Sequence, residues 1–146
     1  MGQINSADRF LGIDYGTKRI GLATSDAQGI AVQPVTVLNR TKLVNDIEQI
    51  AAVCVEREVS RIVVGMPYNM NGSPGRLAGE VQRFADEVGK KTQLPVVFYD
   101  ERLTSHAAEE YLIQDRKMSP EKRKKMKDKI AACIILSSYL ASLRQS

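Results

Sequence analysis

The chain has few of the residues that disulfide-bonded, zinc-binding or membrane proteins need. Its 146 residues include two cysteines and one histidine. Cys54 and Cys133 lie in apolar segments, form no CxxC pair and have no partnering histidines, so we expect buried free thiols. No stretch approaches the roughly 18 apolar residues of a membrane-spanning helix. The sequence therefore predicts a cytoplasmic protein that makes no use of a membrane.

Internal repeats, low-complexity tracts and linkers are also missing from the chain. The first eight residues contain no apolar run, which excludes a signal peptide there. With 43% hydrophobic and 26% charged residues, the chain is long enough to bury a core of its own. We expect residues 1–8 to be a flexible leader and residues 9–146 to form one domain.

Charge is unevenly distributed along the chain, although the net charge is only +4. The segment from Arg116 to Lys129 holds eight bases and two acids, a net charge of +6. A basic segment on a near-neutral body is typical of nucleic-acid binding, although a solvated helix face has the same composition. The bases expected to contact nucleic acid here are Lys122, Arg123, Lys124, Lys125, Lys127 and Lys129.

The first third of the chain predicts three antiparallel strands. Arg9–Tyr15 and Arg19–Ser25 are apolar runs joined by a three-residue turn that begins with Gly16, which is the pattern of a β-hairpin. A polar turn follows, and Ala31–Leu38 predicts the third strand.

The remaining chain alternates helices with strands. Lys42–Glu58 has apolar residues at steps of three and four, which predicts an amphipathic helix. Arg61–Gly65 and Pro95–Tyr99 predict strands buried on both faces. Three more helices are expected: from Ser73-Pro74 towards Lys91, over Leu103–Gln114, and from Ser119-Pro120 to Leu143, the first and last with a serine cap before a proline. The order βββαβαβαα predicts an α/β protein with a five-stranded mixed sheet and helices on both faces.

Carboxylates near strand ends are candidate metal ligands. Asp14 lies in an apolar run, where a charge is costly unless it is paired or bound to metal. The flanking Gly12 and Gly16 leave the backbone open to a ligand. Asp100 and Glu101 follow the last predicted strand. Because neighbouring strand residues face opposite sides, only one of the two can easily join Asp14.

Asp128 is the third candidate, on the last predicted helix. Ala131, Ala132 and Ile135 share its face, and this small apolar face can lie close on the sheet. Converging carboxylates repel one another unless a divalent cation compensates their charge, and oxygen ligands suit Mg²⁺ or Mn²⁺. One or two such ions activate a water molecule for phosphodiester hydrolysis. The pattern therefore predicts a metal-dependent nuclease.

The loop from Gly65 to Gly75 leads into a predicted helix N-terminus, where backbone N–H groups suit a phosphate. Asn69 and Asn71 offer further donors, and Arg76 lies in the predicted first turn, although an ordinary turn-rich loop has the same composition. No Walker motif is present, so we expect no nucleotide cofactor. Lys18 and Arg102 complete the residues expected to contact nucleic acid.

For the other polar and aromatic residues we favour a structural role over a functional one. His106 could protonate a leaving group, but a surface role is more usual for a lone histidine. Asp26 could supply a fourth ligand, but its place in a turn is sufficient to explain it. Tyr15 and Tyr68 flank the site and could stack on bases, although packing in the core or at the rim is favoured.

Four motifs together resemble the bacterial YqgF/RuvX family. They are LGIDYGTKRIGLATSD from Leu11, VGMPYNMNG from Val64, DERLTS from Asp100 and DKIAA from Asp128, in a resemblance that runs from about Arg9 to Leu143. It implies a ribonuclease-H-like fold and a nuclease that matures the 5′ end of 16S rRNA, or else resolves Holliday junctions. It also implies Asp14, Glu101 and Asp128 as catalytic metal ligands, with Asp100 as the alternative to Glu101.

Two other classes of function compete with this interpretation. The segment Asp14–Thr17 also resembles the phosphate-binding hairpin of sugar kinases and actin-like ATPases, but those proteins need two such domains. A non-catalytic accessory of the ribosome or transcription machinery would use the same basic helix, yet the carboxylates would weaken its binding. Cutting a four-way junction calls for a two-fold dimer, and no exposed apolar stripe indicates one. We therefore favour RNA over branched DNA, with pre-ribosomal particles as partners.

Overall fold

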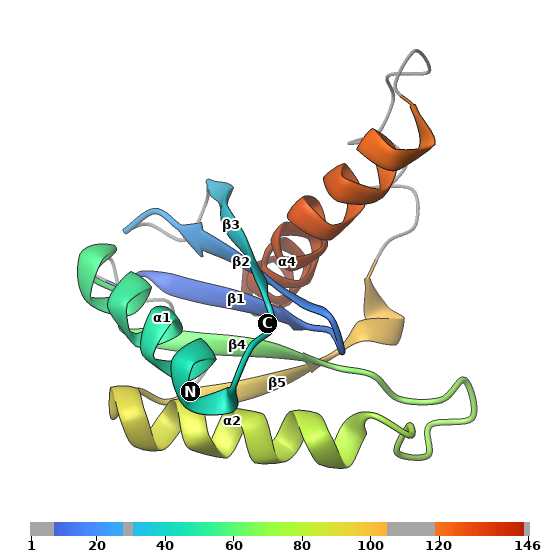
Figure 1. Cartoon of the computed structure of the whole chain (residues 1–146), viewed down its shortest axis with the longest axis horizontal. Helices are drawn as coiled ribbons and strands as arrows, with labels where there is room; N and C mark the ends of the chain where they lie inside the picture. The colour runs from blue at the N-terminus through green and yellow to red at the C-terminus, as the bar shows by residue number, and fades with distance from the viewer. Residues whose placement is uncertain (1–7, 28–30, 105–118, 145–146) are drawn as a thin grey trace.

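The computed structural model describes residues 8–27, 31–104 and 119–144, without the side chains of 123–125 and 128. A five-stranded sheet forms its centre, in the order β3-β2-β1-β4-β5. Helices lie on both faces of this sheet (Figure 1). The predicted mixed α/β architecture is confirmed.

The strands are β1 Phe10–Tyr15, β2 Arg19–Ser25, β3 Val32–Asn39, β4 Arg61–Met66 and β5 Val96–Asp100. The first three are antiparallel neighbours, whereas β4 lies parallel to β1 and β5 parallel to β4. The β1–β2 hairpin is closed by the Gly16 N–H, which donates to the Arg19 carbonyl at 2.9 Å. Because β1, β4 and β5 are parallel, their carboxyl ends meet at one edge of the sheet.

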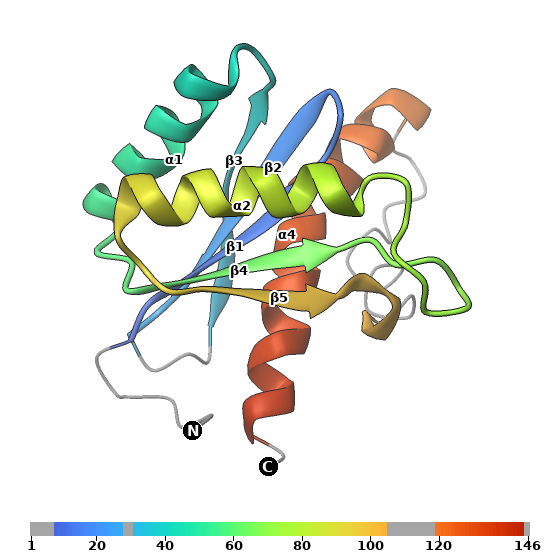
Figure 2. The same cartoon turned by 90° about the horizontal axis from the view of Figure 1, so that it is seen from below.

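The described helices are α1 Leu43–Glu56, α2 Ala78–Thr92 and α4 Pro120–Arg144, with a short 3₁₀ turn, η1, over Glu101–Leu103. Helices α1 and α2 cover one face of the sheet, and α4 crosses the other (Figure 2). The helix predicted over 103–114 falls almost entirely on residues 105–118, which lie outside the described chain, as does most of the predicted leader. No described helix has the length and apolar character to cross a bilayer.

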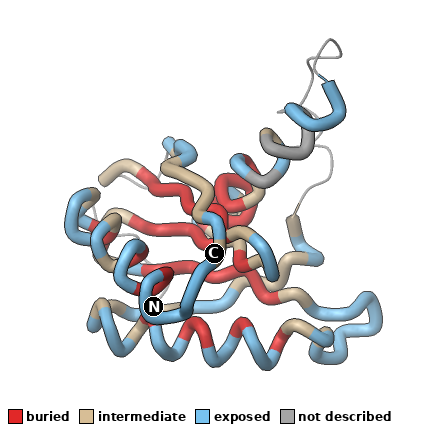
Figure 3. The backbone as a smooth tube through the Cα atoms, in the orientation of Figure 1, coloured by how far each residue is buried: buried red, intermediate tan, exposed pale blue. Residues whose placement is uncertain are grey.

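Alternation along the strands divides the core between the two faces, and the middle strands of the sheet are buried over most of their length (Figure 3). Leu11 and Ile13 pack with α1 and α2, whereas Phe10 and Val63 pack with α4. Gly12 faces α4, and a Cβ atom there would lie 2.7 Å from the Leu136 Cβ and 3.0 Å from the Ala132 carbonyl. The glycine therefore lets α4 lie directly against β1.

The two cysteines are buried free thiols, as predicted. Cys54 lies on α1 and Cys133 on α4, so each belongs to a different face of the core. Burial raises the pKa of both thiols to about 11. Such thiols remain protonated and unreactive at neutral pH.

One predicted helix start was wrong. Helix α2 begins at Ala78 rather than at Pro74. The Ser73 hydroxyl and N–H donate to Asn71 Oδ1 at 2.6 and 3.0 Å, and Pro74 forms a bridge with Tyr68. Ser73 is thus engaged inside the loop and caps no helix. The same Ser-Pro pattern at 119–120 does open α4, where Ser119 Oγ accepts from the Lys122 N–H at 3.3 Å.

Candidate active site

A cavity of about 180 Å³ lies at the carboxyl ends of the parallel strands, against α4. The carboxylates of Asp14, from the end of β1, and Glu101, from η1 after β5, both line it. Thr104 and three apolar residues of α4 complete the wall: Ala131, Ile134 and Ile135. Two acids from distant parts of the sequence thus meet in a recess with one apolar wall, formed by α4.

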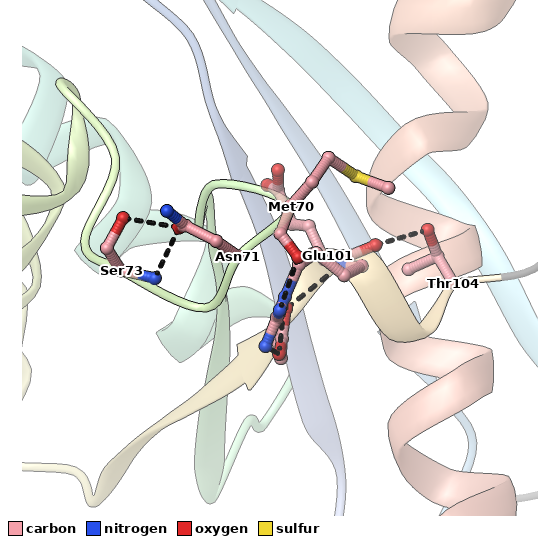
Figure 4. Close-up of polar contacts among 7 residues, drawn as sticks. Met70, Asn71, Ser73, Glu101 and Thr104 are labelled. Carbon is pink, nitrogen blue, oxygen red and sulfur yellow. Dashed lines mark hydrogen bonds and ion pairs between the residues drawn. The ribbon is translucent and has the colours of Figure 1, made fainter.

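Glu101 reaches this recess because Gly65 leaves room for it. A Cβ atom on Gly65 would lie 2.7 Å from Glu101 Oε1 and 2.7 Å from the Ile135 Cδ1. The backbone is fixed by Thr104, whose hydroxyl donates to the Glu101 carbonyl at 2.7 Å (Figure 4). A glycine on β4 therefore forms the floor of the site.

Asp100, the alternative acid, is engaged elsewhere. Its carboxylate accepts hydrogen bonds from the Arg102 backbone N–H at 2.9 Å and from the Arg102 Nη2 at 2.6 Å. The hydrogen bonds and positive charge of Arg102 hold the pKa of Asp100 below its ordinary value. Of the acidic pair, only Glu101 lines the cavity with Asp14.

The electrostatics of the recess disfavour two negative charges. Burial raises the pKa of Glu101 to about 7, with further contributions from the charge of Asp14, a hydrogen bond between the two carboxyl groups and the charge of Asp100. Carboxylates that share a site in this way repel each other, and a divalent cation between them removes the repulsion. The donor set therefore fits Mg²⁺ or Mn²⁺, which prefer oxygen ligands.

The raised pKa of Glu101 makes the stability of the metal-free protein depend on pH. The folded protein keeps the Glu101 proton up to a pKa of about 7, whereas an ordinary glutamic acid ionises near 4.5. Between these values folding binds a proton, so the free energy of unfolding falls as pH rises towards about 7 and levels off above it. Thermal melts in EDTA between pH ~5 and ~8 measure this slope, which Glu101→Gln is expected to remove. Equal slopes in both proteins would contradict a buried Glu101 beside Asp14.

Position 128 lies on α4 three residues before Ala131 and seven before Ile135, both of which line the cavity. It therefore falls on the helix face that meets the recess. The Asp128 side chain is outside the described residues, as are those of Arg123, Lys124 and Lys125, and His106 is outside altogether. Among the side chains described, no three candidate ligands meet as a metal site.

None of the other predicted contact residues whose side chains are described lines the recess. Lys18 is exposed in the β1–β2 turn, and Arg76 is exposed just before α2. Asn69 and Asn71 bond with Ser73 inside the loop, and the helix that follows begins only at Ala78. Of the bases on α4 predicted to contact nucleic acid, Lys122, Lys127 and Lys129 are exposed. Asp26 lies at the opposite end of the sheet, where it lines a separate cavity with Arg9 and Arg57.

A partly buried polar network around Tyr15, the residue after Asp14, was missed by the sequence reasoning. The Tyr15 hydroxyl donates to Glu80 at 2.7 Å and accepts from Arg40 at 2.6 Å. Arg40 also pairs with the fully buried Asp46 at 3.5 Å. Tyr15 is therefore a packed residue, as favoured, and the network fixes the strand end that carries Asp14. The signal in the sequence was Asp46, an acid on the apolar face of the predicted helix, which needs a buried partner.

Comparison with known proteins identifies relatives along nearly the whole chain. The family model described as "RuvX: Holliday junction resolvase" matches residues 8–142. A protein of Caldanaerobacter subterraneus named "Putative pre-16S rRNA nuclease" is 44% identical over 138 residues, which cover 94% of this chain and 99% of the relative. A protein of the same name from Carboxydothermus hydrogenoformans is 46% identical, with 90% and 95% covered.

Solved structures share the fold at low sequence identity. Thermus thermophilus RuvC, in complex with a Holliday junction substrate, superposes with a TM-score of 0.62 at 14% identity, covering 95% of this chain and 98% of that one. The yeast mitochondrial Holliday junction resolvase Ydc2 gives 0.56 at 14% identity, with 98% and 83% covered. These likenesses confirm the ribonuclease-H-like fold, and the matches along the sequence show that the chain belongs to the RuvX family.

Proposed function

We propose that this chain is a divalent-metal-dependent nuclease that hydrolyses phosphodiester bonds during maturation of the 5′ end of 16S rRNA. Asp14, Glu101 and Asp128 would hold one or two Mg²⁺ or Mn²⁺ ions. Residues 9–146 would form the nuclease domain, preceded by a leader of residues 1–8. The reaction would take place in the cytoplasm, on pre-ribosomal particles.

The observation that carries the proposal is the pair of carboxylates in one recess. Asp14 comes from β1 and Glu101 from the turn after β5, the two carboxyl groups share a hydrogen bond, and burial together with the charge of Asp14 raises the pKa of Glu101 to about 7. Such an arrangement destabilises the metal-free protein, and it becomes favourable when a divalent cation binds between the two carboxylates. A purely structural acid pair would gain nothing from this repulsion.

The chain's own residues then have separate tasks. When bound, the metal would activate water and stabilise the leaving oxygen. Asp14 and Glu101 would hold it in place, against the apolar side chains of α4 that line the recess. The exposed bases at 122, 127 and 129 lie on the same helix, upstream of or beside the cavity-lining turn. They are suited to bind the phosphates that flank the scissile bond.

RNA is favoured over branched DNA as the substrate. The relatives named for pre-16S rRNA are 44% and 46% identical to this chain. The resolvases named for Holliday junctions resemble it at 14% identity, which supports the fold alone. Junction resolution stays the second candidate because the matching family model carries that description.

A side-by-side cleavage assay tests the proposed substrate. Purified protein is incubated with end-labelled precursor 16S rRNA or with a four-way DNA junction, each in Mg²⁺, Mn²⁺ or EDTA. We expect metal-dependent cleavage of the RNA and none of the junction. Cleavage of the junction alone would make the protein a resolvase. If neither is cut although both are bound, the protein is a non-catalytic accessory.

A further inference from the structure

Arg102 is exposed, but several contacts hold its guanidinium in place. Its Nε lies 3.1 Å from both oxygens of Asp100, and its Nη2 lies 2.6 Å from Asp100 Oδ2. Its Nη1 donates to the Met70 carbonyl at 3.4 Å. The guanidinium carbon also lies 5.6 Å from the centroid of the Tyr68 ring. Because Asp100 compensates its charge, Arg102 is better suited to hold the loop than to grip a phosphate.

The loop that Arg102 holds, residues 67–75, is also braced from within. The Asn69 N–H donates to the Ser73 carbonyl at 3.0 Å, and the Gly72 N–H donates to the Asn69 carbonyl at 2.9 Å. Gly72 has a φ of +86°, which favours glycine. Figure 4 shows the further bonds between Asn71 and Ser73. The loop therefore has a defined shape, set mainly by its own hydrogen bonds, and its last residue, Gly75, accepts a hydrogen bond from the first N–H of α2, that of Ala78, at 3.1 Å.

This loop presents large side chains to solvent beside the carboxylates. Met70 is 91% exposed and Tyr68 is 36% exposed. The loop leaves β4 two residues after Gly65, whose α-carbon borders Glu101, and its anchor Arg102 is the residue after Glu101. An exposed aromatic ring and an exposed thioether here add nothing to the core. Flat, polarisable surfaces of this kind bind nucleobases by stacking, whatever the base.

We propose that loop 67–75 forms a subsite for one unpaired nucleotide next to the scissile phosphate. The base stacks on the surface made by Tyr68, Met70 and the Arg102 guanidinium. Asp100 is the positioning residue, because its carboxylate holds the Arg102 guanidinium and so keeps this surface in place. The inference rests on the proposed nuclease function and deepens it: the substrate is single-stranded or frayed at the cleavage site, since a base held in a duplex cannot reach the surface.

The absence of tryptophan from the chain allows a direct test. Tyr68→Trp places a single indole in the loop, and EDTA prevents cleavage. We expect a single-stranded RNA oligonucleotide to quench the indole emission and the blunt duplex of the same sequence to leave it unchanged. Phe98→Trp is the matched control, since Phe98 is 39% exposed on β5 and its emission should change with neither. Equal quenching by both RNAs, or none with the single strand bound, would overturn the subsite.

Affinities measured in EDTA separate stacking from charge. Tyr68→Ala is expected to weaken single-strand binding by about 5- to 100-fold, and Tyr68→Phe to restore it, because the ring is the binding group. Arg102→Lys keeps the positive charge but loses the planar, bidentate grip on Asp100. We expect it to weaken binding as much as Arg102→Ala does, and Asp100→Asn to raise KM more than it lowers kcat. Wild-type affinity in Arg102→Lys would show that charge alone suffices, contrary to the proposal.

These outcomes can be told apart from failure of the nuclease itself. If wild-type protein cuts RNA while Tyr68→Ala binds and cuts normally, the subsite is refuted and the nuclease stands. If wild-type protein cuts nothing but the single strand still quenches the indole emission of the Tyr68→Trp variant, the subsite stands without the enzyme.

Discussion

The Asp14→Asn variant is expected to lose phosphodiester cleavage by about 1000-fold or more while it still folds and binds RNA. The amide has the size of the carboxylate but cannot compensate a metal ion, and metal stabilisation of the transition state amounts to several kcal/mol. The thermal stability of the metal-free protein, by contrast, should increase. Removing the charge beside Glu101 relieves the repulsion that raises its pKa, so the metal-free variant should melt at a higher temperature than wild type at pH ~8.

Asp26→Asn is the matched control for this substitution. It is the same chemical change, at the opposite end of the sheet from the recess. We expect this variant to cleave RNA at the wild-type rate. Full activity in Asp14→Asn, or an equal loss in both variants, would remove Asp14 from the proposed site.

The Gly65→Ala variant should lose cleavage by at least about 100-fold, because the new methyl group has no room. A Cβ atom at this position lies 2.7 Å from both Glu101 Oε1 and the Ile135 Cδ1. Either Glu101 moves out of the recess or α4 moves away from β4. We expect a cost of about 1–3 kcal/mol in the free energy of unfolding, as for other overpacked sites, measured by urea denaturation.

Gly79→Ala provides the comparison in an open position. The nearest atom to a Cβ there is the Arg83 Nη1 at 3.7 Å, within helix α2. Alanine should raise stability by about 1 kcal/mol through helix propensity and leave cleavage unchanged. If Gly65→Ala behaved like Gly79→Ala, the close approach of Glu101 to β4 would be contradicted.

Much of the fold was predictable because local patterns determine it. The apolar runs at 10–15 and 61–66 and the three-to-four periodicity of α1 follow from which faces are buried. Strand alternation also predicted that Asp100 and Glu101 diverge. It could not say which of them turns towards Asp14, because that depends on the parallel pairing of β4 with β5 and on the space left by Gly65.

The errors and omissions involve contacts between residues far apart in sequence or competing local hydrogen bonds. Ser73 followed by Pro74 has the pattern of a helix start, but the Ser73 hydroxyl donates to Asn71 Oδ1 instead of capping a helix. The pairing of Arg40 with Asp46 and Glu80 joins a loop to two helices, which no periodicity encodes. Likewise, nothing in the sequence indicated that Arg102, a predicted nucleic-acid contact, bonds with Asp100 and the Met70 carbonyl.

Titration with Mn²⁺, followed by the electron paramagnetic resonance signal of the free ion, tests the central claim most directly. Wild-type protein, Asp14→Asn, Glu101→Gln and Asp100→Asn would be compared without substrate at pH ~8, where Glu101 is ionised. We predict saturable binding by wild type and Asp100→Asn, and its loss in the two variants of the recess. Equal binding by all four proteins, or loss only in Asp100→Asn, would contradict a metal site formed by Asp14 and Glu101.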